Sequence, residues 1–278
     1  MAEVWENLPL SDGHYLLSFY SPLQAGATRP GQFAMLRLCD RPDILLRRPM
    51  SIYDIKPASL KSKLPELIQV VYKVVGSGTK AMAELKPGDA LEVLAPLGHG
   101  YFQEDYQEKL LRADEVLLVA GGIGIAALLL SARELHERGI QQRLFFGGKT
   151  GADLVCYEDF GGLVQETILA SEDGSRGQKG FVTIPLEKYL GGNKGRKILI
   201  MVCGPWPMLE ACVGLARGYG HPCLVSMENR MGCGMGVCLG CSIRVKGDGH
   251  GAYERVCTEG PVFWSDHVSW AVGDTPEI

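Results

Sequence analysis

Glu115-Val-Leu-Leu-Val-Ala-Gly-Gly-Ile-Gly124 decides the fold of the central part of this chain. Val116 to Ala120 form an apolar run, which is typical of a strand buried on both faces of a parallel sheet. The glycines from Gly121 to Gly124 predict a tight turn, and residues 126–138 then show a helical pattern that stops at Gly139. A strand, a glycine turn and a helix in this order present amide N–H groups that suit a pyrophosphate.

A glycine turn alone is weak evidence, because close packing of a helix on a strand also requires glycine. The pattern is incomplete here, since Ala127 stands where a third glycine is usual. A second strand, 197–203, ends in the same sheet at Cys203-Gly-Pro205, and ligands bind at the carboxyl ends of such strands. The two strand ends together predict a dinucleotide site made of Gly121, Gly122, Gly124, Cys203, Gly204 and Pro205.

The rest of the chain divides around this unit. Residues 1–100 contain short apolar or alternating runs, with Pro and Gly between them, which predict an antiparallel barrel or sandwich. Segment 56–65 has the composition of a solvated hairpin loop. Residues 101–225 alternate strands with helices and predict a parallel α/β domain. Residues 226–278 form a separate module rich in Cys and Gly. The predicted fold class is therefore β + α/β with a small C-terminal module.

The C-terminal module carries four cysteines at a diagnostic spacing. Cys233, Cys238 and Cys241 give C-x4-C-x2-C, and Cys257 follows sixteen positions later. This spacing is that of plant-type [2Fe–2S] ligation. The interleaved glycines let the loop take positive φ and point its amides at a cluster. The alternatives are zinc, which usually shows paired short Cys/His spacings, and disulfides.

Composition narrows the function classes. The chain has 278 residues, a net charge of −4 and no basic block, so nucleic-acid binding is not expected. Nine cysteines in a chain of this length do not fit a disulfide scaffold. The opening residues resemble no signal peptide, and the apolar run 116–130 is too short to span a bilayer. We therefore expect a cytoplasmic protein without membrane contact.

Two stretches of the first domain suit phosphate groups. Arg48 in Arg-Pro-Met-Ser51 can form a bidentate fork with a phosphate, and Ser51 can bond a flavin ring or ribityl chain. Gly76-Ser-Gly-Thr79 precedes a helix expected to start near Lys80, whose N-terminus can hold a second phosphate. Either stretch can also be an ordinary turn or helix cap.

Counting electrons connects the three regions. A nicotinamide gives two electrons as a hydride, whereas a [2Fe–2S] cluster accepts one at a time. A chain that holds both needs a converter between them, and a flavin is the usual one. The barrel is where we expect that flavin.

Taken in chain order, these motifs resemble the ferredoxin–NADP reductase superfamily. The match extends to Met231–Cys241 and to Cys257-Thr-Glu-Gly-Pro-Val-Phe263, which resemble the electron-transfer subunits of heteromeric NAD-dependent dihydroorotate dehydrogenases. The resemblance covers nearly the whole chain. It implies an FAD-binding β-barrel, an NAD-binding domain and a [2Fe–2S] module, with cluster ligation by Cys233, Cys238, Cys241 and Cys257. The FAD contacts that it implies are Arg48, Pro49, Met50, Ser51, Val71, Tyr72, Lys73, Gly78 and Thr79.

The resemblance also implies a partner. That partner is an FMN-containing catalytic subunit that oxidises dihydroorotate to orotate, in a heterotetramer with two copies of each subunit. This chain would pass electrons between that FMN and NAD, and it shows no catalytic residues for dihydroorotate oxidation. Met50 replaces the aromatic residue usual in the superfamily, which removes aromatic stacking on the flavin from that position.

Two other functions fit the same motifs. One is a subunit of an NAD(P)H:ferredoxin or sulfide-type reductase, and the other is a cluster-bearing sensor without catalysis. NAD is expected over NADP because residues 147–153 contain no arginine for a 2′-phosphate, although Arg176 follows. Cys203 is expected beside the nicotinamide or in simple packing. The remaining cysteines are expected to be structural, namely Cys39, Cys156, Cys212 and Cys223.

Overall fold

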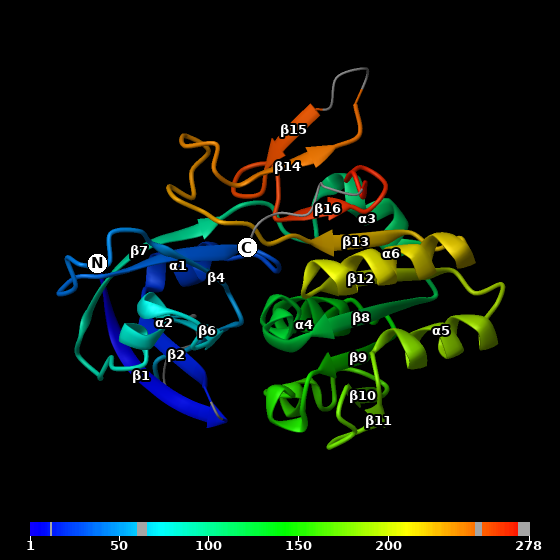
Figure 1. Cartoon of the computed structure of the whole chain (residues 1–278), viewed down its shortest axis with the longest axis horizontal. Helices are drawn as coiled ribbons and strands as arrows, with labels where there is room; N and C mark the ends of the chain where they lie inside the picture. Colours follow the sequence, from blue (N-terminus) through cyan, green and yellow to red (C-terminus); the bar gives the residue numbers. More distant parts are fainter. Residues whose placement is uncertain (12, 60–65, 248–251, 272–278) are drawn as a thin grey trace.

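The computed structural model describes residues 1–11, 13–59, 66–247 and 252–271. An antiparallel barrel sheet, blue to cyan in Figure 1, takes up the first part of the chain in the order β4-β3-β7-β1-β2-β6-β5. Its strands are β1 (Ala2–Ser11), β2 (His14–Tyr20), β3 (Phe33–Leu38), β4 (Arg48–Ser51), β5 (Asp54–Lys56), β6 (Leu67–Lys73) and β7 (Ala90–Leu97). Two short helices, α1 (Pro22–Ala27) and α2 (Ser77–Met82), lie against it.

Alternation along β6 places this barrel against the rest of the molecule. Ile68, Val70 and Tyr72 point into the barrel core, whereas Val71 packs into the core of the second domain. Successive side chains of a strand point to opposite faces, so one strand contributes to two cores. The barrel is therefore held to its neighbour by buried apolar contact.

The second sheet is parallel except at one edge. Its order is β11-β10-β9-β8-β12-β13-β16, with only β16 antiparallel among the described strands. The strands are β8 (Glu115–Gly121), β9 (Gln142–Gly148), β10 (Thr167–Ser171), β11 (Gln178–Lys179), β12 (Ile198–Cys203), β13 (Cys223–Ser226) and β16 (Val262–Trp264). The connecting segments are α3 (Glu104–Leu111), η1 (Gly122–Ala127), α4 (Leu129–Glu137), η2 (Gly151–Asp153), η3 (Tyr157–Phe160), α5 (Thr183–Gly192) and α6 (Trp206–Tyr219).

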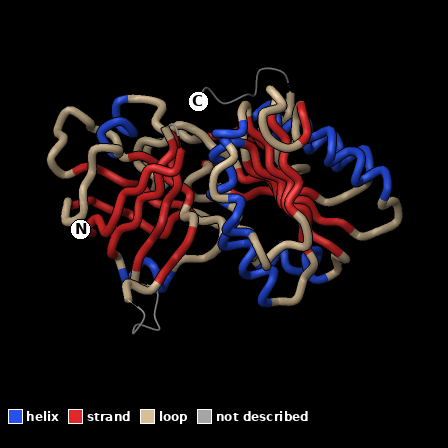
Figure 2. Tube along the Cα trace, turned by 90° about the horizontal axis from the view of Figure 1, so that it is seen from below, coloured by secondary structure: helices blue, strands red, loops and turns tan. Residues whose placement is uncertain are grey.

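Helices cover this sheet on both faces, as Figure 2 shows. Val116 and Leu118 of β8 belong to a core that includes residues of α3 and α4. Leu117 and Val119 belong to a core that includes residues of α5 and α6. A strand covered on both faces needs a continuous apolar run, which is why the central sequence lacks polar alternation.

The order of the strands fixes where a ligand can bind. From β8 the chain proceeds to β9 and β10 on one side, and from β12 it proceeds to β13 on the other. The point where the order reverses lies between β8 and β12, which pair in parallel from Ile198–Glu115 to Cys203–Ala120. Connections that leave in opposite directions open a crevice at the carboxyl ends of the two strands.

Two helix boundaries differ from the sequence predictions. The helix expected over 126–138 is split into the 3₁₀ segment η1 and α4, which begins at Leu129. The glycines favour the tighter turn, since Gly122 has φ +51°. Helix α2 begins at Ser77, earlier than expected, because the Thr79 hydroxyl accepts hydrogen bonds from the Val75 and Gly76 amides. Residues 60–65 of the expected loop 56–65 lie outside the described residues.

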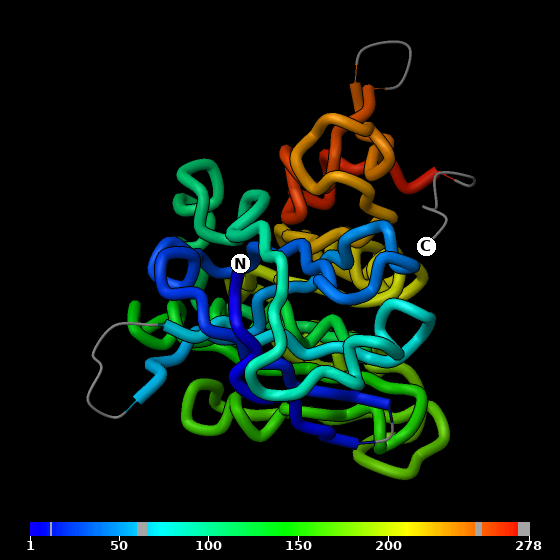
Figure 3. The backbone as a smooth tube through the Cα atoms, turned by 90° about the vertical axis from the view of Figure 1, so that its left-hand side faces the viewer, coloured from blue at the N-terminus to red at the C-terminus, as the bar shows by residue number. Residues whose placement is uncertain are grey.

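The C-terminal part contributes to two places. A hairpin of β14 (Ser242–Val245) and β15 (Ala252–Arg255) stands above the other two parts, in orange in Figures 1 and 3. Strand β16 then returns to pair with β13 of the parallel sheet. The module is thereby attached to the parallel α/β part through the edge of its sheet. Within the described ranges, no helix has the length and apolar character needed to cross a bilayer.

Candidate functional site

The two loops that the sequence placed at one sheet edge are in contact. A Cβ atom built on Gly124 would lie 2.6 Å from the carbonyl carbon of Cys203 and 2.8 Å from the amide nitrogen of Gly204. One on Gly121 would lie 3.0 Å from Cδ of Pro205. These glycines therefore allow the ends of β8 and β12 to approach more closely than side chains permit.

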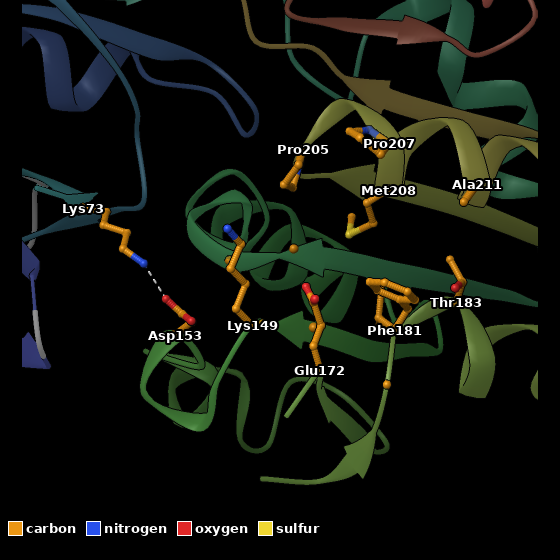
Figure 4. A pocket seen from close by; sticks show the side chains of 16 residues that line it. Lys73, Lys149, Asp153, Glu172, Phe181, Thr183, Pro205, Pro207, Met208 and Ala211 are labelled. Carbon is orange, nitrogen blue, oxygen red and sulfur yellow. Dashed lines mark hydrogen bonds and ion pairs between the residues drawn. The ribbon is translucent and has the colours of Figure 1, made fainter. Parts of the chain in front are cut away.

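A pocket of about 510 Å³ opens beside these loops. Figure 4 shows its side chains converging from the barrel, from the strand ends and from α6. It lies at the point where the strand order reverses, and it includes Gly121, Gly122 and Pro205 from the predicted set. The other lining residues are Lys73, Gly147, Gly148, Lys149, Asp153, Glu172, Gly180, Phe181, Val182, Thr183, Pro207, Met208 and Ala211.

One end of this pocket is closed by an ion pair between the two domains. Nζ of Lys73, at the end of β6, lies 2.5 Å from Oδ1 of Asp153 in η2 (Figure 4). Burial raises the pKa of the Asp153 carboxyl, but Lys73 and the Thr150 amide outweigh that effect and hold the pKa below its ordinary value. Lys73, expected among the FAD contacts, thus lies on the border between the barrel and this pocket.

Further polar contacts fix the same border. The Tyr53 hydroxyl donates to the Asp159 carboxylate, and Arg133 donates to Asp54 at 2.8 Å. Asp54 is nearly fully buried, and its charge is paired with Arg133 and with Nζ of Lys56, which lies 3.2 Å from its Oδ2. The relative position of barrel and pocket is therefore set by charged as well as apolar contacts.

Cys203 is unsuited to act as a nucleophile. Its side chain is buried at the end of β12, and its paired residue in β13 is Ser226. Burial raises the pKa of the thiol well above its ordinary value, and the nearby Glu228 carboxylate raises it further. A thiol held in this neutral form fits a packing role, and Cys203 is not among the residues that line the pocket, so its predicted contact with the dinucleotide stays a prediction.

In the barrel, two of the predicted FAD-contact segments meet. A Cβ atom on Gly78 would lie 2.6 Å from Cζ of Arg48, so the guanidinium occupies the space that a side chain at 78 would fill. The third member, Thr79, is buried beside them. A guanidinium packed against a glycine backbone is the kind of cradle that a pyrophosphate fits.

The other predicted FAD positions differ in their surroundings. Val71 and Tyr72 are almost fully buried, and the Tyr72 ring stacks on Tyr15 with centroids 5.5 Å apart. Pro49, Met50 and Ser51 lie half-buried on β4. Ligand contact from Val71 and Tyr72 would therefore come from their backbone.

Three of the four predicted cluster cysteines lie in the loop of residues 232–241, called here the cysteine loop, and Cys257 lies beside that loop in the turn after β15. The thiol of Cys233 interacts with that of Cys238, and the thiol of Cys241 interacts with that of Cys257. In the part of the chain that the structure describes, no three His, Cys, Asp or Glu side chains converge as ligands of one metal ion. Two pairs of thiols fit a two-iron cluster with two cysteines on each iron.

Backbone amides of the cysteine loop point at these sulfurs. The amides of Met235 and Cys238 lie 3.4 Å from Sγ of Cys233, and the amide of Gly236 lies 3.2 Å from Sγ of Cys257. Burial raises the pKa of Cys233, but the amides of Cys238, Met235 and Val237 and the Cys238 thiol outweigh that effect and lower it to about 6. Burial and the Cys241 thiol raise the pKa of Cys257 to about 11. Amide donors directed at sulfur stabilise thiolate ligands.

The shape of the cysteine loop depends on left-handed backbone at three positions. Gly234 and Gly236 have φ of +73° and +81°, and Leu239 has φ of +60°. A leucine in this region is strained, and such strain is retained where the surroundings impose it. The loop also packs against the barrel. A Cβ on Gly234 would lie 2.5 Å from Cγ of Met35 in β3, so the glycine backbone is in contact with that side chain.

The remaining cysteines are unpaired in the structure, where all nine are free thiols. Cys212 and Cys223 lie in the core between the parallel sheet and α6, and burial raises the pKa of Cys212 to about 12. Cys39 and Cys156 are half-buried. The structural role expected for these four stays a prediction.

Comparison with known proteins decides the family. The model for the "iron-sulfur cluster binding domain of dihydroorotate dehydrogenase B" matches residues 228–269, and that for the "oxidoreductase NAD-binding domain" matches residues 118–214. The dihydroorotate dehydrogenase B (NAD(+)) electron transfer subunit of Caldanaerobacter subterraneus subsp. tengcongensis is 36% identical over 86% of this chain and 86% of its own. That of Fusobacterium nucleatum subsp. nucleatum is 36% identical over 95% of this chain and 96% of its own. The chain belongs to this family of electron transfer subunits.

Solved structures agree with this assignment. A chain of the NADH-dependent reduced ferredoxin–NADP oxidoreductase superposes with a TM-score of 0.82, at 30% identity over 97% of this chain and 90% of that one. The ferredoxin reductase in carbazole 1,9a-dioxygenase, at 22% identity and a TM-score of 0.63, covers 80% of this chain and 65% of that one and shares the fold. The predicted fold class and the membership of an oxidoreductase subunit family are confirmed. The predicted set of FAD, [2Fe–2S] and NAD is confirmed for the family, while the individual contact residues stay predictions.

Several pocket residues were not predicted from the sequence. Lys149, Asp153, Glu172 and Phe181 come from three separate loops, and no motif connects them. Glu172 could have been predicted from the sequence, because it directly follows the apolar run of β10 at the carboxyl edge of the sheet, where ligands bind. The others became recognisable only through the pocket that they share.

Proposed function

We propose that this chain passes electrons between an FMN-containing dihydroorotate-oxidising subunit and NAD. When bound, FAD exchanges a hydride with nicotinamide and the [2Fe–2S] cluster exchanges single electrons, which is the conversion that such a path needs. The supporting observation is the position of the barrel. The cysteine loop seats on Met35 of β3, and Lys73 of β6 lines the nucleotide pocket. The barrel therefore contacts both ends of the proposed path.

The residues of this chain divide the work of holding the three groups. Gly121, Gly122, Gly124 and the Cys203-Gly204-Pro205 turn hold the dinucleotide at the point where the strand order reverses. Arg48, Gly78 and Thr79 hold the FAD pyrophosphate, with the other implied contacts around them. The ligands of the cluster are Cys233, Cys238, Cys241 and Cys257.

The partner is proposed to dock on the cysteine loop. Cys238 is exposed, and the apolar side chains of Met235, Val237 and Leu239 beside it are also exposed. Apolar residues gathered at a surface are typical of an interface. We propose a heterotetramer of two subunits of each kind, located in the cytoplasm, with domains over 1–100, 101–225 and 226–278.

The test is an anaerobic preparation of the chain alone, assayed for flavin, iron and absorbance during titration with NADH. We expect about one FAD and two irons per chain, with both chromophores bleached by NADH. Zinc in place of iron, or a chain without flavin, would contradict the proposal. Dihydroorotate oxidation by the chain without its partner would contradict the proposed division of labour.

A second function is favoured by the 30% identity with a chain of the NADH-dependent reduced ferredoxin–NADP oxidoreductase. In that case the cluster would exchange electrons with a different partner, such as ferredoxin. Co-purification with an FMN protein that oxidises dihydroorotate supports the first function. Rapid reduction of free ferredoxin without such a partner supports the second.

Glu172 is expected to favour NAD over NADP. We place the nicotinamide at the end of the pocket that includes Lys73 of the barrel, where the FAD is proposed to bind, and the adenosine near Phe181 and Glu172 (Figure 4). The Glu172 carboxylate can bond a ribose hydroxyl and repels a 2′-phosphate. Arg176 is the arginine that the sequence offered as a partner for the 2′-phosphate of NADP. In the structure it stacks on Tyr157, with Cζ 4.8 Å from the ring centroid.

Replacing Glu172 by glutamine should raise the ratio of kcat/KM for NADPH to that for NADH by roughly tenfold, which corresponds to about 1.4 kcal/mol. The measurement is steady-state reduction of a dye by each nucleotide. The matched control is Glu187→Gln, which removes an exposed carboxylate of α5 outside the pocket and should leave the ratio unchanged. An unchanged ratio in Glu172→Gln would assign the preference to other residues.

A further inference from the structure

Arg255, at the end of β15, joins the two segments that carry the cluster cysteines. Its Nη1 donates to the Gly236 carbonyl in the cysteine loop at 2.9 Å. Its Nε donates to Oε2 of Glu259 at 3.0 Å, and its Nη2 donates to the other carboxylate oxygen. The Arg255 amide also donates to Glu259 Oε2 at 2.7 Å. Glu259 thus holds the guanidinium in one orientation, by a bidentate pair that only an arginine can form.

The residue that Arg255 holds contacts a proposed ligand directly. Gly236 donates its amide to Sγ of Cys257 at 3.2 Å, with φ at +81°. No side chain fits at this position, because a Cβ there would lie 2.8 Å from Cγ2 of Thr258 and 3.0 Å from Nη1 of Arg255. Gly236 therefore sits between the guanidinium on one side and the Cys257 sulfur on the other.

We propose that Arg255 is a positioning residue of the cluster, which fixes Gly236 so that its amide donates to the Cys257 ligand and thereby raises the reduction potential. The inference rests on the proposed function, since it assumes a [2Fe–2S] cluster on the four cysteines. The physical reason is charge. Reduction adds one negative charge to the cluster and its thiolates, and hydrogen bonds to the sulfurs stabilise that added charge. The Gly236 amide is the hydrogen-bond donor, and Arg255 keeps that amide directed at Sγ of Cys257.

The effect of position can be separated from the effect of charge. Arg255→Gln removes both the fork and the positive charge, whereas Arg255→Lys keeps the charge and loses the fork. A lysine has a single ammonium and cannot bind the Gly236 carbonyl and both oxygens of Glu259 in one plane. If Arg255 acts by position, the two variants should change in the same direction. The matched control is Arg230→Gln, which removes an exposed arginine three positions before Cys233.

The experiment measures the midpoint potential of the cluster by EPR redox titration of the purified chain, with iron and FAD content and the rate of iron release to a chelator. For Arg255→Gln we expect about a tenfold fall in the ratio of reduced to oxidised cluster at a fixed potential, which is about 59 mV for one electron. Arg255→Lys should show a fall in the same direction and faster release of iron. Arg230→Gln should match the wild type.

The outcomes are distinct. A potential and iron release in Arg255→Lys equal to those of the wild type would mean that charge alone acts, and would overturn the positioning role. If Arg255→Gln loses its iron, with or without its FAD, it has no cluster potential to measure, and the lysine variant decides. A wild-type chain without iron would instead contradict the proposed function, before the variants are compared.

Discussion

Replacing Cys257 by serine is expected to remove the iron from this chain while leaving FAD and its reduction by NADH intact. Cys257 is almost fully buried, its thiol contacts that of Cys241, and it accepts the Gly236 amide. A serine hydroxyl stays protonated at neutral pH and is a poor ligand for iron–sulfur clusters, which are held by thiolates. The barrel and the nucleotide pocket lie in other parts of the chain, so they should remain folded.

The readouts are iron per FAD, dye reduction by NADH, and transfer of electrons to the FMN partner. Electron transfer to the partner should fall by more than about 100-fold. Mutating a residue that only hydrogen-bonds a metal ligand already lowers metal affinity or activity by about 10–100-fold, and Cys257 is itself a proposed ligand. Dye reduction that takes electrons from FAD should be nearly unchanged. The matched control is Cys39→Ser, a half-buried cysteine outside the cysteine loop. Full iron content in Cys257→Ser would show that this cysteine is not a ligand.

Replacing Gly124 by alanine is expected to impair nucleotide binding and stability together. The added Cβ would overlap the carbonyl group of Cys203, so the ends of β8 and β12 must move apart at the point where the dinucleotide is proposed to bind. Both contacts are backbone atoms of the sheet and cannot move aside as a side chain can. Overpacking of this kind costs about 1–3 kcal/mol.

The measurements are the KM for NADH and the thermal unfolding midpoint. If the whole cost falls on binding, the KM should rise by roughly tenfold, because about 1.4 kcal/mol is a factor of ten. The control is Gly214→Ala in α6, where an added Cβ meets nothing within 4 Å. An exposed helical position gains up to about 1 kcal/mol from this change, so the control should be neutral or stabilised. A wild-type KM in Gly124→Ala would exclude the proposed role of the turn.

Several elements could be predicted from the sequence because local patterns specify them. The run 115–120 is apolar at every position but the first, and the structure buries it on both faces of a parallel sheet. The glycines that follow allow a close approach that other residues do not. The spacing of Cys233, Cys238 and Cys241 constrains them to one loop, which is why the cluster prediction needed no knowledge of the fold.

Other features depend on residues far apart in the chain. Lys73 belongs to a barrel strand, yet it forms an ion pair with Asp153 at one end of the proposed nucleotide pocket. Glu172 and Phe181 follow different strands and meet only because β9, β10 and β11 are neighbours in the sheet. No sequence motif records these contacts, because the residues share no spacing that could be recognised.

The sequence by itself therefore determined the apolar strands, the glycine turn and the cysteine spacing, since each results from steric and solvation preferences within a few residues. The tertiary structure decided which of these segments meet. It placed β8 beside β12, seated the cysteine loop on the barrel, and brought Arg255 to Gly236. Such pairings depend on the packing of whole sheets against one another, which is a property of the complete fold.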